Sequence, residues 1–293
     1  MLFNVAIDWV MRKTTEDQPR GIRWNLFNNI EDLDFADDIA LLCHTHTHMQ
    51  EKTNRLSKFG QHVGLKISQK KTEIMTLNIK SPTTITIEDS NLPQTQEFTY
   101  LGSIIRHDGG AEKDIKNRLG KARNAFNMLN NVWKSQQYSI KTKLKLYRSC
   151  VVATLLYGSE CWRMTEKDLD RLSTFHTKSL RRIKRLFWPK RISNEELLSS
   201  LNQDNMNTII TQRRWRWIGH VLRKDVGAIP RVAIQWRPEG KRKRGRPKNT
   251  WRRTVETEAA AMGHSWGTLR VMAQDRDRWR SFVAALIASR QEG

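Results

Sequence analysis

Leu33-Asp34-Phe35-Ala36-Asp37-Asp38-Ile39-Ala40-Leu41-Leu42 is an apolar stretch that two adjacent carboxylates interrupt. Apolar residues flank the pair and Gly and Pro are absent, so the pattern predicts strand, tight turn and strand, with Asp37 and Asp38 at or beside the turn. Buried strands would leave the carboxylates at a partly dry site. Adjacent carboxylates repel unless a cation neutralises them, and magnesium prefers such oxygen ligands. An Asp-Asp pair is also common turn chemistry, because Asp tolerates turn geometry.

The charge of the chain points to a polyanionic partner. The 293 residues include 52 Lys and Arg against 30 Asp and Glu, a formal net charge of +22. Such a surplus favours nucleic acid as the leading partner and an anionic membrane surface as the second. No apolar run approaches the roughly 20 residues that a spanning helix needs, so membrane insertion is not expected. The chain has three widely spaced cysteines, Cys43, Cys150 and Cys161. Their spacing predicts that they are reduced core residues of a cytosolic or nuclear protein.

The first 110 residues combine short strands with two helices. Helical spacing predicts the end of one helix over residues 4–12 and a second helix over Met49–Val63, which Gly64 ends. We expect the second helix to pack on the sheet of the carboxylate hairpin. Short strands are predicted at residues 22–24 and 83–87, and a compact extended segment at residues 98–104.

Residues 111–204 form a predicted helical subdomain. Apolar positions recur at helical spacing over residues 115–129, 140–157 and 169–186, the last run bounded by Pro189. The charges expected on the exposed faces of these helices are nearly all positive, and would form a cradle for a duplex backbone. These cations are Lys116, Arg118, Lys121, Arg123, Arg181, Arg182, Lys184 and Arg185.

Residues 205–293 form a basic, mainly helical region in this prediction. Arginines alternate with tryptophans at its start, which suits phosphate pairing and base stacking and makes Arg213, Arg214 and Arg216 candidate nucleic-acid contacts. A segment at about residues 236–249 holds Gly, Pro and cations with almost nothing apolar, and predicts a mobile linker. Its candidate nucleic-acid-binding residues are Lys241, Arg242, Lys243, Arg244, Arg246 and Lys248. Two closing helices are expected, over residues 251–262 and 275–288.

The centre of the linker, Arg244-Gly245-Arg246-Pro247-Lys248, resembles the AT-hook core, in which an extended Gly-Arg-Pro lies in a narrow A·T minor groove. A nuclear import signal or a plain basic linker would have the same composition, because short basic motifs match often by chance. All three interpretations remain open.

The ordered series of motifs resembles the C-terminal part of the endonuclease/reverse transcriptase of non-LTR, LINE-type retrotransposons, with the RTE group nearest. Phe35-Ala36-Asp37-Asp38 resembles the palm motif that carries two metal-binding aspartates. Residues Gly64 to Thr72 resemble the motif that follows it, and Phe98-Thr99-Tyr100-Leu101-Gly102 resembles the primer grip. The helices from Ala111 onward resemble the thumb. The resemblance covers essentially the whole chain.

The resemblance implies an α+β fold, with part of a polymerase palm, a small antiparallel sheet with helices, followed by a helical thumb and a basic C-terminal region. It implies transfer of a deoxynucleotide to a primer 3′ hydroxyl on an RNA template. Asp37 and Asp38 would hold Mg²⁺, and Lys71 would assist departure of pyrophosphate. Tyr100, Leu101 and Gly102 would seat the primer end.

One departure from the family bears on activity. The family has a third catalytic aspartate upstream of the nucleotide-binding loop, and Met1-Leu2-Phe3 aligns just after that loop; Asp8 lies on the following helix and does not replace it. We therefore expect little or no polymerase activity from this chain alone. Two alternatives are a non-catalytic nucleic-acid-binding protein and a degenerate transposon relic without selected function. A nuclear or cytoplasmic location, away from membranes, is expected.

Overall fold

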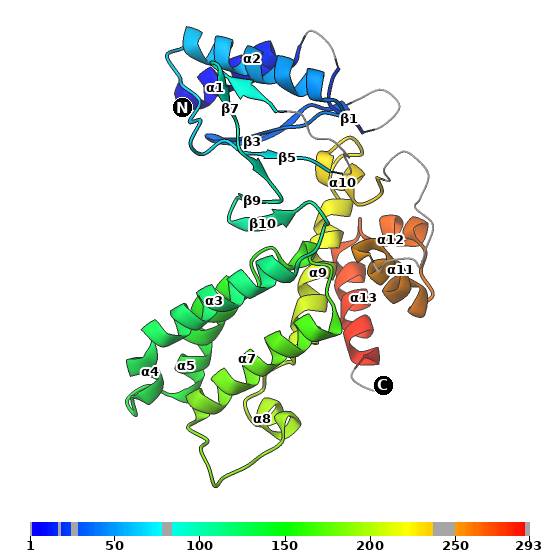
Figure 1. The fold of residues 1–293 in the computed structure, drawn as a ribbon. Helices are drawn as coiled ribbons and strands as arrows, with labels where there is room; N and C mark the ends of the chain where they lie inside the picture. Colours follow the sequence, from blue (N-terminus) through cyan, green and yellow to red (C-terminus); the bar gives the residue numbers. More distant parts are fainter. Residues whose placement is uncertain (1, 17–18, 25–28, 78–83, 237–249, 291–293) are drawn as a thin grey trace. The chain divides into compact units, whose positions relative to one another are not determined.

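The computed structural model describes residues 2–16, 19–24, 29–77, 84–236 and 250–290. The chain divides into two compact units, Met1–Gly110 and Ala111–Gly293 (Figure 1). Each unit has hydrophobic clusters of its own: a small one around Ile85, Ile87 and Leu92 in the first unit, and two larger ones in the second.

The N-terminal unit combines two helices with short strands. The helices are α1 (Leu2–Thr15) and α2 (His46–His62). The strands are β1 (Ile22–Arg23), β2 (Asn29–Ile30), β3 (Asp32–Phe35), β4 (Asp38–Leu41), β5 (Ile74–Met75), β6 (Thr86–Ile87), β7 (Ser90–Asn91), β8 (Gln94–Thr95), β9 (Glu97–Tyr100) and β10 (Ser103–Arg106).

The described strands pair two by two and not as one sheet. Antiparallel ladders join β1 to β2, β3 to β4, β6 to β7 and β9 to β10, and a parallel ladder joins β5 to β8. The α+β prediction is therefore confirmed, with several two-stranded ladders in place of the small sheet.

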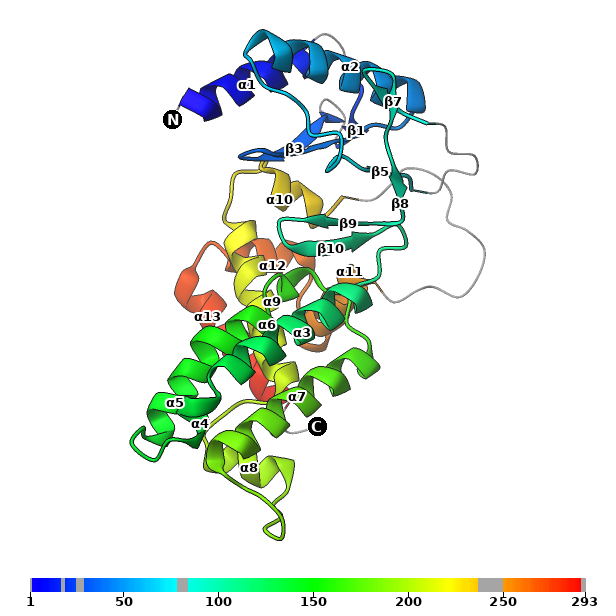
Figure 2. The same cartoon turned by 60° about the vertical axis from the view of Figure 1, so that its left-hand side comes forward.

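Helix α2 is bonded to both ends of the β3–β4 hairpin. Thr45 caps the helix start by accepting from the His48 N–H, and Gly64, with φ +75°, follows its end. Buried Lys52 donates from Nζ to the carbonyls of Glu31 (3.0 Å) and Leu42 (2.7 Å), which flank the hairpin, and pairs with the Glu31 carboxylate at 2.5 Å. The expected packing of this helix on the hairpin is confirmed. Figures 1 and 2 show α1 and α2 together on one side of the strands.

The C-terminal unit is helical in all its described elements. These are α3 (Glu112–Met128), α4 (Asn130–Lys134), α5 (Ile140–Leu146), the π-helical turn η1 (Tyr147–Val152), α6 (Ala153–Leu155), the 3₁₀ turn η2 (Ser159–Cys161), α7 (Glu166–Lys184), α8 (Asn194–Ser200), α9 (Met206–Leu222), α10 (Ile229–Ala233), α11 (Trp251–Ala261), α12 (Trp266–Met272) and α13 (Arg276–Ser289). The helices predicted from residues 115, 140, 169, 251 and 275 onward are all present.

Helix α9 belongs to both hydrophobic clusters of this unit. Its first half, through Met206 and Ile210, packs into the cluster of α3 to α8, and its second half, through Trp215 and Ile218, into that of α11 to α13. The helix begins at Met206, just after the boundary that we predicted at residues 204 and 205, but its first half packs with the helices before that boundary. A separation of the thumb-like part from the C-terminal region stays a prediction.

Two further predictions concern the cysteines and membrane insertion. All three cysteines are free, but Cys150 and Cys161 are exposed, so the prediction of core residues is wrong for these two. Among the described helices, none is long and apolar enough to cross a bilayer.

Candidate functional site

The β3–β4 hairpin presents the two adjacent aspartates at its tip. Phe35 pairs with Asp38 as the last rung of the ladder, so Ala36 and Asp37 form the two-residue turn. Ala36 has φ +55°, in the left-handed region that non-glycine residues rarely adopt. The predicted strand, turn and strand are confirmed, with Asp37 in the turn and Asp38 beside it.

The carboxylates are exposed to solvent. Asp37 and Asp38 are both exposed, and the Phe35 side chain, which shares a face of the ladder with Asp38, is 64% exposed. The expectation of buried strands and a partly dry site is therefore wrong for the described residues. The reason is that a two-stranded ladder has no neighbouring strand, and α2 is bonded to its ends and not to its tip.

Tyr100 connects the predicted primer grip to this hairpin. It ends β9, and its hydroxyl donates to the backbone carbonyl of Leu33 on β3 at 3.2 Å. Burial raises the pKa of the Tyr100 hydroxyl, and the negative charges of Asp34, Asp38 and Asp32 raise it further. The hydroxyl therefore stays protonated, as a donor beside the acidic hairpin.

The turn after Tyr100 is built from two residues with positive φ. Leu101 has φ +48° and Gly102 has φ +76°, the arrangement of a type I′ hairpin turn between β9 and β10. Of the three residues predicted to seat the primer end, Tyr100 faces the Asp hairpin through its hydroxyl, and the other two form the turn.

The hairpin carries more negative charge than the Asp-Asp pair alone. Asp32 and Asp34 lie two apart on β3 and share one face of the ladder, whereas Asp38 lies on the other face with Phe35. Burial, followed by the charge of Asp34, raises the pKa of Asp32. Sequence reasoning did not single out these two residues, although their alternation on a predicted strand was a usable signal.

The donor set suits magnesium but is small. Among the described residues, no three His, Cys, Asp or Glu side chains come together as a metal-binding group. Mg²⁺ is commonly held by one or two carboxylates together with the phosphates of a substrate. The Asp37 and Asp38 carboxylates fit that role, as the protein's share of a site that a nucleotide would complete.

Lys71 lies in an exposed turn before β5. The Lys71 N–H donates to the Ser68 carbonyl at 3.0 Å. Within the described ranges, no hydrogen bond or ion pair joins Lys71 to Asp37 or Asp38. Its assignment as a general acid stays a prediction.

The comparison with known proteins bears directly on this unit. Residues 1–105 match the family of reverse transcriptases, which are RNA-dependent DNA polymerases. The matched span includes the β3–β4 hairpin, α2, Lys71 and all but the last residue of the β9–β10 hairpin. The chain is also similar to a transposon-derived protein of Caenorhabditis elegans, at 26% identity over 271 residues, which covers 87% of this chain and 95% of that protein. These findings confirm the resemblance to a retrotransposon reverse transcriptase.

Beyond the matched residues 1–105, the arginines at the start of the third predicted region have different environments. Arg214 is buried on α9 and pairs with the buried Glu258 carboxylate at 2.5 Å, so its prediction as a nucleic-acid contact is wrong. Arg213 is half-buried and pairs with Glu160 at 2.9 Å. Arg216 is exposed. The predicted linker contacts Lys241, Arg242, Lys243, Arg244, Arg246 and Lys248 lie outside the described residues.

The structure also leaves fewer free surface cations in the predicted cradle of residues 111–204. Arg118 is buried and its guanidinium lies over the Tyr157 ring at 4.3 Å, so it is not a surface cation. Lys116 pairs with Glu112 at 2.9 Å. Lys121 and Arg123 are exposed on α3.

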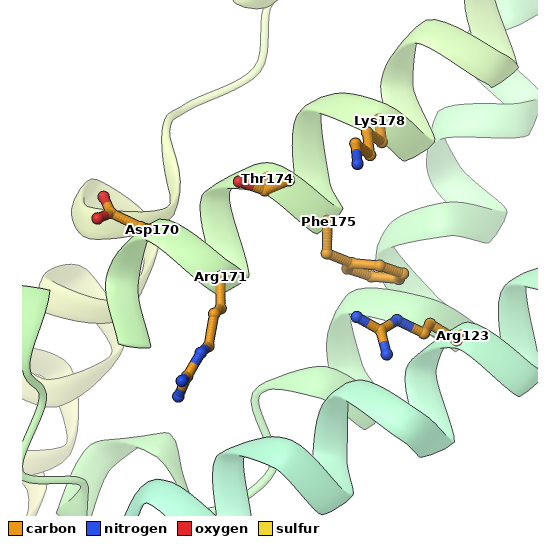
Figure 3. A pocket seen from close by; sticks show the side chains of 6 residues that line it. All are labelled: Arg123, Asp170, Arg171, Thr174, Phe175 and Lys178. Atoms are coloured by element: carbon orange, nitrogen blue, oxygen red, sulfur yellow. The ribbon is translucent and has the colours of Figure 1, made fainter. Parts of the chain in front are cut away.

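A shallow pocket of about 390 Å³ between α3 and α7 lies beside Arg123. Its lining residues are Arg123, Asp170, Arg171, Thr174, Phe175 and Lys178 (Figure 3). Figure 3 shows Arg123 beside the Phe175 ring, whereas Asp170 points away from both. The pocket lining therefore includes three cations, one carboxylate and an aromatic ring.

Proposed function

We propose that the chain is part of the reverse transcriptase of a non-LTR, RTE-like retrotransposon. The observation that carries this proposal is the pairing of two hairpins within residues that match the reverse-transcriptase family, where Tyr100 donates to the backbone of the hairpin that bears Asp37 and Asp38. The proposed reaction is RNA-templated transfer of a deoxynucleotide to a primer 3′ hydroxyl.

In this proposal Asp37 and Asp38 hold Mg²⁺ through exposed carboxylate oxygens. Bound Mg²⁺ would neutralise charge on the phosphate oxygens during transfer. The turn at Leu101 and Gly102 supports the primer end, and the Tyr100 hydrogen bond fixes that turn relative to the carboxylates. Lys71 donates a proton toward the departing pyrophosphate. The partners are an RNA template, a DNA primer, their hybrid or duplex DNA, in the nucleus or cytoplasm.

We further propose that residues 1–293 alone have little or no polymerase activity. The resemblance implies a third carboxylate, and the described residues group no third acidic side chain with the Asp pair. Loss of one ligand or electrostatic contact from such a site costs several kcal/mol of transition-state stabilisation.

Binding of a labelled RNA–DNA primer–template tests the site separately from turnover. In wild type, Mg²⁺ together with the complementary deoxynucleotide is expected to increase affinity. Asp37→Asn and Asp38→Asn are expected to abolish that increase. Asp89→Asn is the matched control, because Asp89 is an exposed aspartate in a hairpin turn of the same unit. An increase that survives in both hairpin variants would contradict the proposed metal site.

Primer extension with Mg²⁺ tests the proposed inactivity. Product in wild type that vanishes in Asp37→Asn would overturn the inactivity while supporting the role of the aspartate. Product that persists in that variant would count against both.

A non-catalytic nucleic-acid-binding protein is the second candidate, which the basic pocket of α3 and α7 favours. It predicts that the logarithm of affinity falls linearly with the logarithm of salt concentration, with no dependence on Asp37 or Asp38. Arg123→Ala with Lys178→Ala should then lower the slope by about 2, because each phosphate contact contributes nearly one. An unchanged slope would remove the pocket from the interface.

A further inference from the structure

The segment between α7 and α8 exposes two adjacent aromatic side chains. Phe187 is 61% and Trp188 is 80% exposed, although large aromatic side chains usually bury most of their surface. Figures 1 and 2 show this segment as a loop that projects beyond the neighbouring helices of its unit. Such exposure is unfavourable unless the rings meet a partner.

Both ends of this loop are anchored. Leu186 and Ile192 pack against the hydrophobic cluster of α3 to α8. Arg181 of α7 donates to the Ile192 carbonyl at 3.1 Å, and the Lys190 N–H donates to the Phe187 carbonyl at 3.0 Å. The exposed residues 187–191 are therefore held by fixed ends, so that the aromatic rings need little further ordering to bind.

Cations surround the two rings. The eleven residues from Arg181 to Arg191 include six Lys and Arg and no Asp or Glu. Arg185, Lys190 and Arg191 are exposed and, in the part of the chain that the structure describes, make no ion pair. The nearest carboxylates in sequence are those of Glu195 and Glu196, and Glu196 already accepts from the Ser193 N–H in a capping box. The same loop thus exposes both aromatic rings and positive charges.

We propose that residues 185–191 bind single-stranded nucleic acid, with Phe187 and Trp188 stacking on unpaired bases and Arg185, Lys190 and Arg191 pairing with phosphates. Aromatic rings with exposed faces and interleaved cations are the two elements of sequence-tolerant single-strand binding. A duplex offers no free base faces, so the loop should prefer a single strand. The proposal rests on the proposed function only in taking nucleic acid as the partner; the residues differ from those of the Asp hairpin.

An anionic membrane surface is the competing partner for aromatic and basic residues. Membrane-surface segments are typically amphipathic helices with a broad apolar face. Here the apolar surface consists of two rings and Pro189 in a short non-helical loop. This small area suits stacking on bases better than insertion into lipid.

The test measures affinity of the full chain for a labelled oligothymidine, for a blunt duplex of equal length, and for phosphatidylcholine–phosphatidylserine vesicles. Trp188→Ala and Phe187→Ala should each weaken oligothymidine binding about five- to a hundredfold, the range expected for one stacked base. Trp188→Phe should retain most of the affinity because it keeps a stacking ring. Tyr138→Ala is the matched control, since Tyr138 is a 49% exposed aromatic residue of the same unit.

Salt dependence separates the cations from the rings. Lys190→Ala with Arg191→Ala should lower the slope of log affinity against log salt by about 1.4, which corresponds to two single-strand phosphate contacts. Lys141→Ala with Lys145→Ala, two exposed cations of α5, should leave the slope unchanged. Trp188→Ala should lower affinity without changing the slope.

Equal oligothymidine affinity in Trp188→Ala and Tyr138→Ala would overturn the proposal. Vesicle binding that Trp188→Ala abolishes, with oligothymidine binding intact, would overturn it in favour of a membrane contact. The Mg²⁺-dependent binding of the RNA–DNA hybrid is measured on the same variants. If that binding is absent while Trp188→Ala still weakens single-strand binding, the proposed function fails and this inference stands.

Discussion

Trp279 of α13 lies against Gly219 of α9 so closely that a β-carbon on Gly219 would come within 2.2 Å of the indole Nε1. That Nε1 donates to the carbonyl of Trp215, one helical turn earlier, at 3.0 Å. Both tryptophans are buried. Gly219 is therefore required by the close approach of two helices, and its neighbours Trp217 and Ile218 pack in the same core.

Gly219→Ala should destabilise the C-terminal unit. The added methyl group must displace Trp279 or push α13 from α9, and overpacking of this kind typically costs 1–3 kcal/mol. Gly120→Ala on α3 is the control, because nothing lies within 4 Å of its added β-carbon and Ala favours a helix by about 1 kcal/mol. Urea unfolding should show a loss for the first variant and no loss for the second. Equal stabilities would contradict the close contact.

Glu258 is a buried carboxylate that accepts from three donors. Arg214 Nη2 and Trp215 Nε1 each lie at 2.5 Å, and Arg290 Nη2 lies at 3.2 Å. Glu258→Gln keeps the shape but leaves Arg214 buried without its counter-charge. Breaking a buried pair in this way costs about 3–5 kcal/mol.

Chemical denaturation can measure this loss. Glu112→Gln is the control: it removes an exposed carboxylate that pairs with Lys116, and should change stability little. Arg214→Met combined with Glu258→Met should be less destabilising than Glu258→Gln, because no buried charge remains uncompensated and Arg290 is partly exposed to solvent. If the double variant loses as much stability as Arg214→Met and Glu258→Met lose together when each is measured alone, coupling between the two residues is contradicted.

His176 should make stability depend on pH. Its Nδ1 lies 2.9 Å from the Tyr147 hydroxyl, and its Nε2 lies 3.2 Å from the Asp204 carbonyl. Burial lowers the pKa of His176 to about 4, and the Arg148 charge also lowers it, whereas the Asp204 contact opposes the shift. In the unfolded chain the pKa is near 6.5.

The unfolded chain therefore binds a proton between pH 6.5 and 4 that the folded chain does not. The free energy of unfolding should fall by up to ~3 kcal/mol as the pH drops through this window, because one pKa unit is about 1.4 kcal/mol. His176→Gln should flatten this part of the profile, and His220→Gln, at an exposed position of α9, should not. A wild-type profile that is level from pH 6.5 to 4.5 would contradict the prediction.

Local patterns in the sequence predicted the elements that local forces specify. The helix of Ile115, Leu119, Ala122 and Phe126 is visible because these residues recur at helical spacing and all bury against the same cluster. The carboxylate hairpin is visible because apolar residues flank a turn-forming pair. These features depend on neighbours within a few residues.

Long-range pairing could not be predicted in the same way. Arg214 was expected on the surface because arginine is rarely buried unless paired, and its partner Glu258 lies 44 residues away. The exposure of Phe35 likewise depends on which other strands flank the hairpin, and the hydrogen bond from Tyr100 to Leu33 joins residues 67 apart. No spacing rule specifies these contacts.

Leu101 is the position where stability and the proposed function make separable predictions. It occupies the first central position of the β9–β10 turn with φ +48°, where a Leu side chain costs roughly 1–2 kcal/mol and Asn is better tolerated. Its side chain is 38% exposed, so the buried apolar surface that replacement loses is smaller than for a core leucine. Leu101→Asn should therefore slow hydrogen exchange of the amides in Glu97–Arg106 in the full chain. Ile105→Asn, at a 45% exposed strand position with ordinary φ, should speed that exchange.

If Leu101 also supports the primer end, Leu101→Asn should bind the RNA–DNA hybrid more weakly despite its more stable turn, because strained residues that persist often serve a site. Faster exchange in Leu101→Asn would contradict the strain, and unchanged hybrid affinity would remove Leu101 from the primer contact.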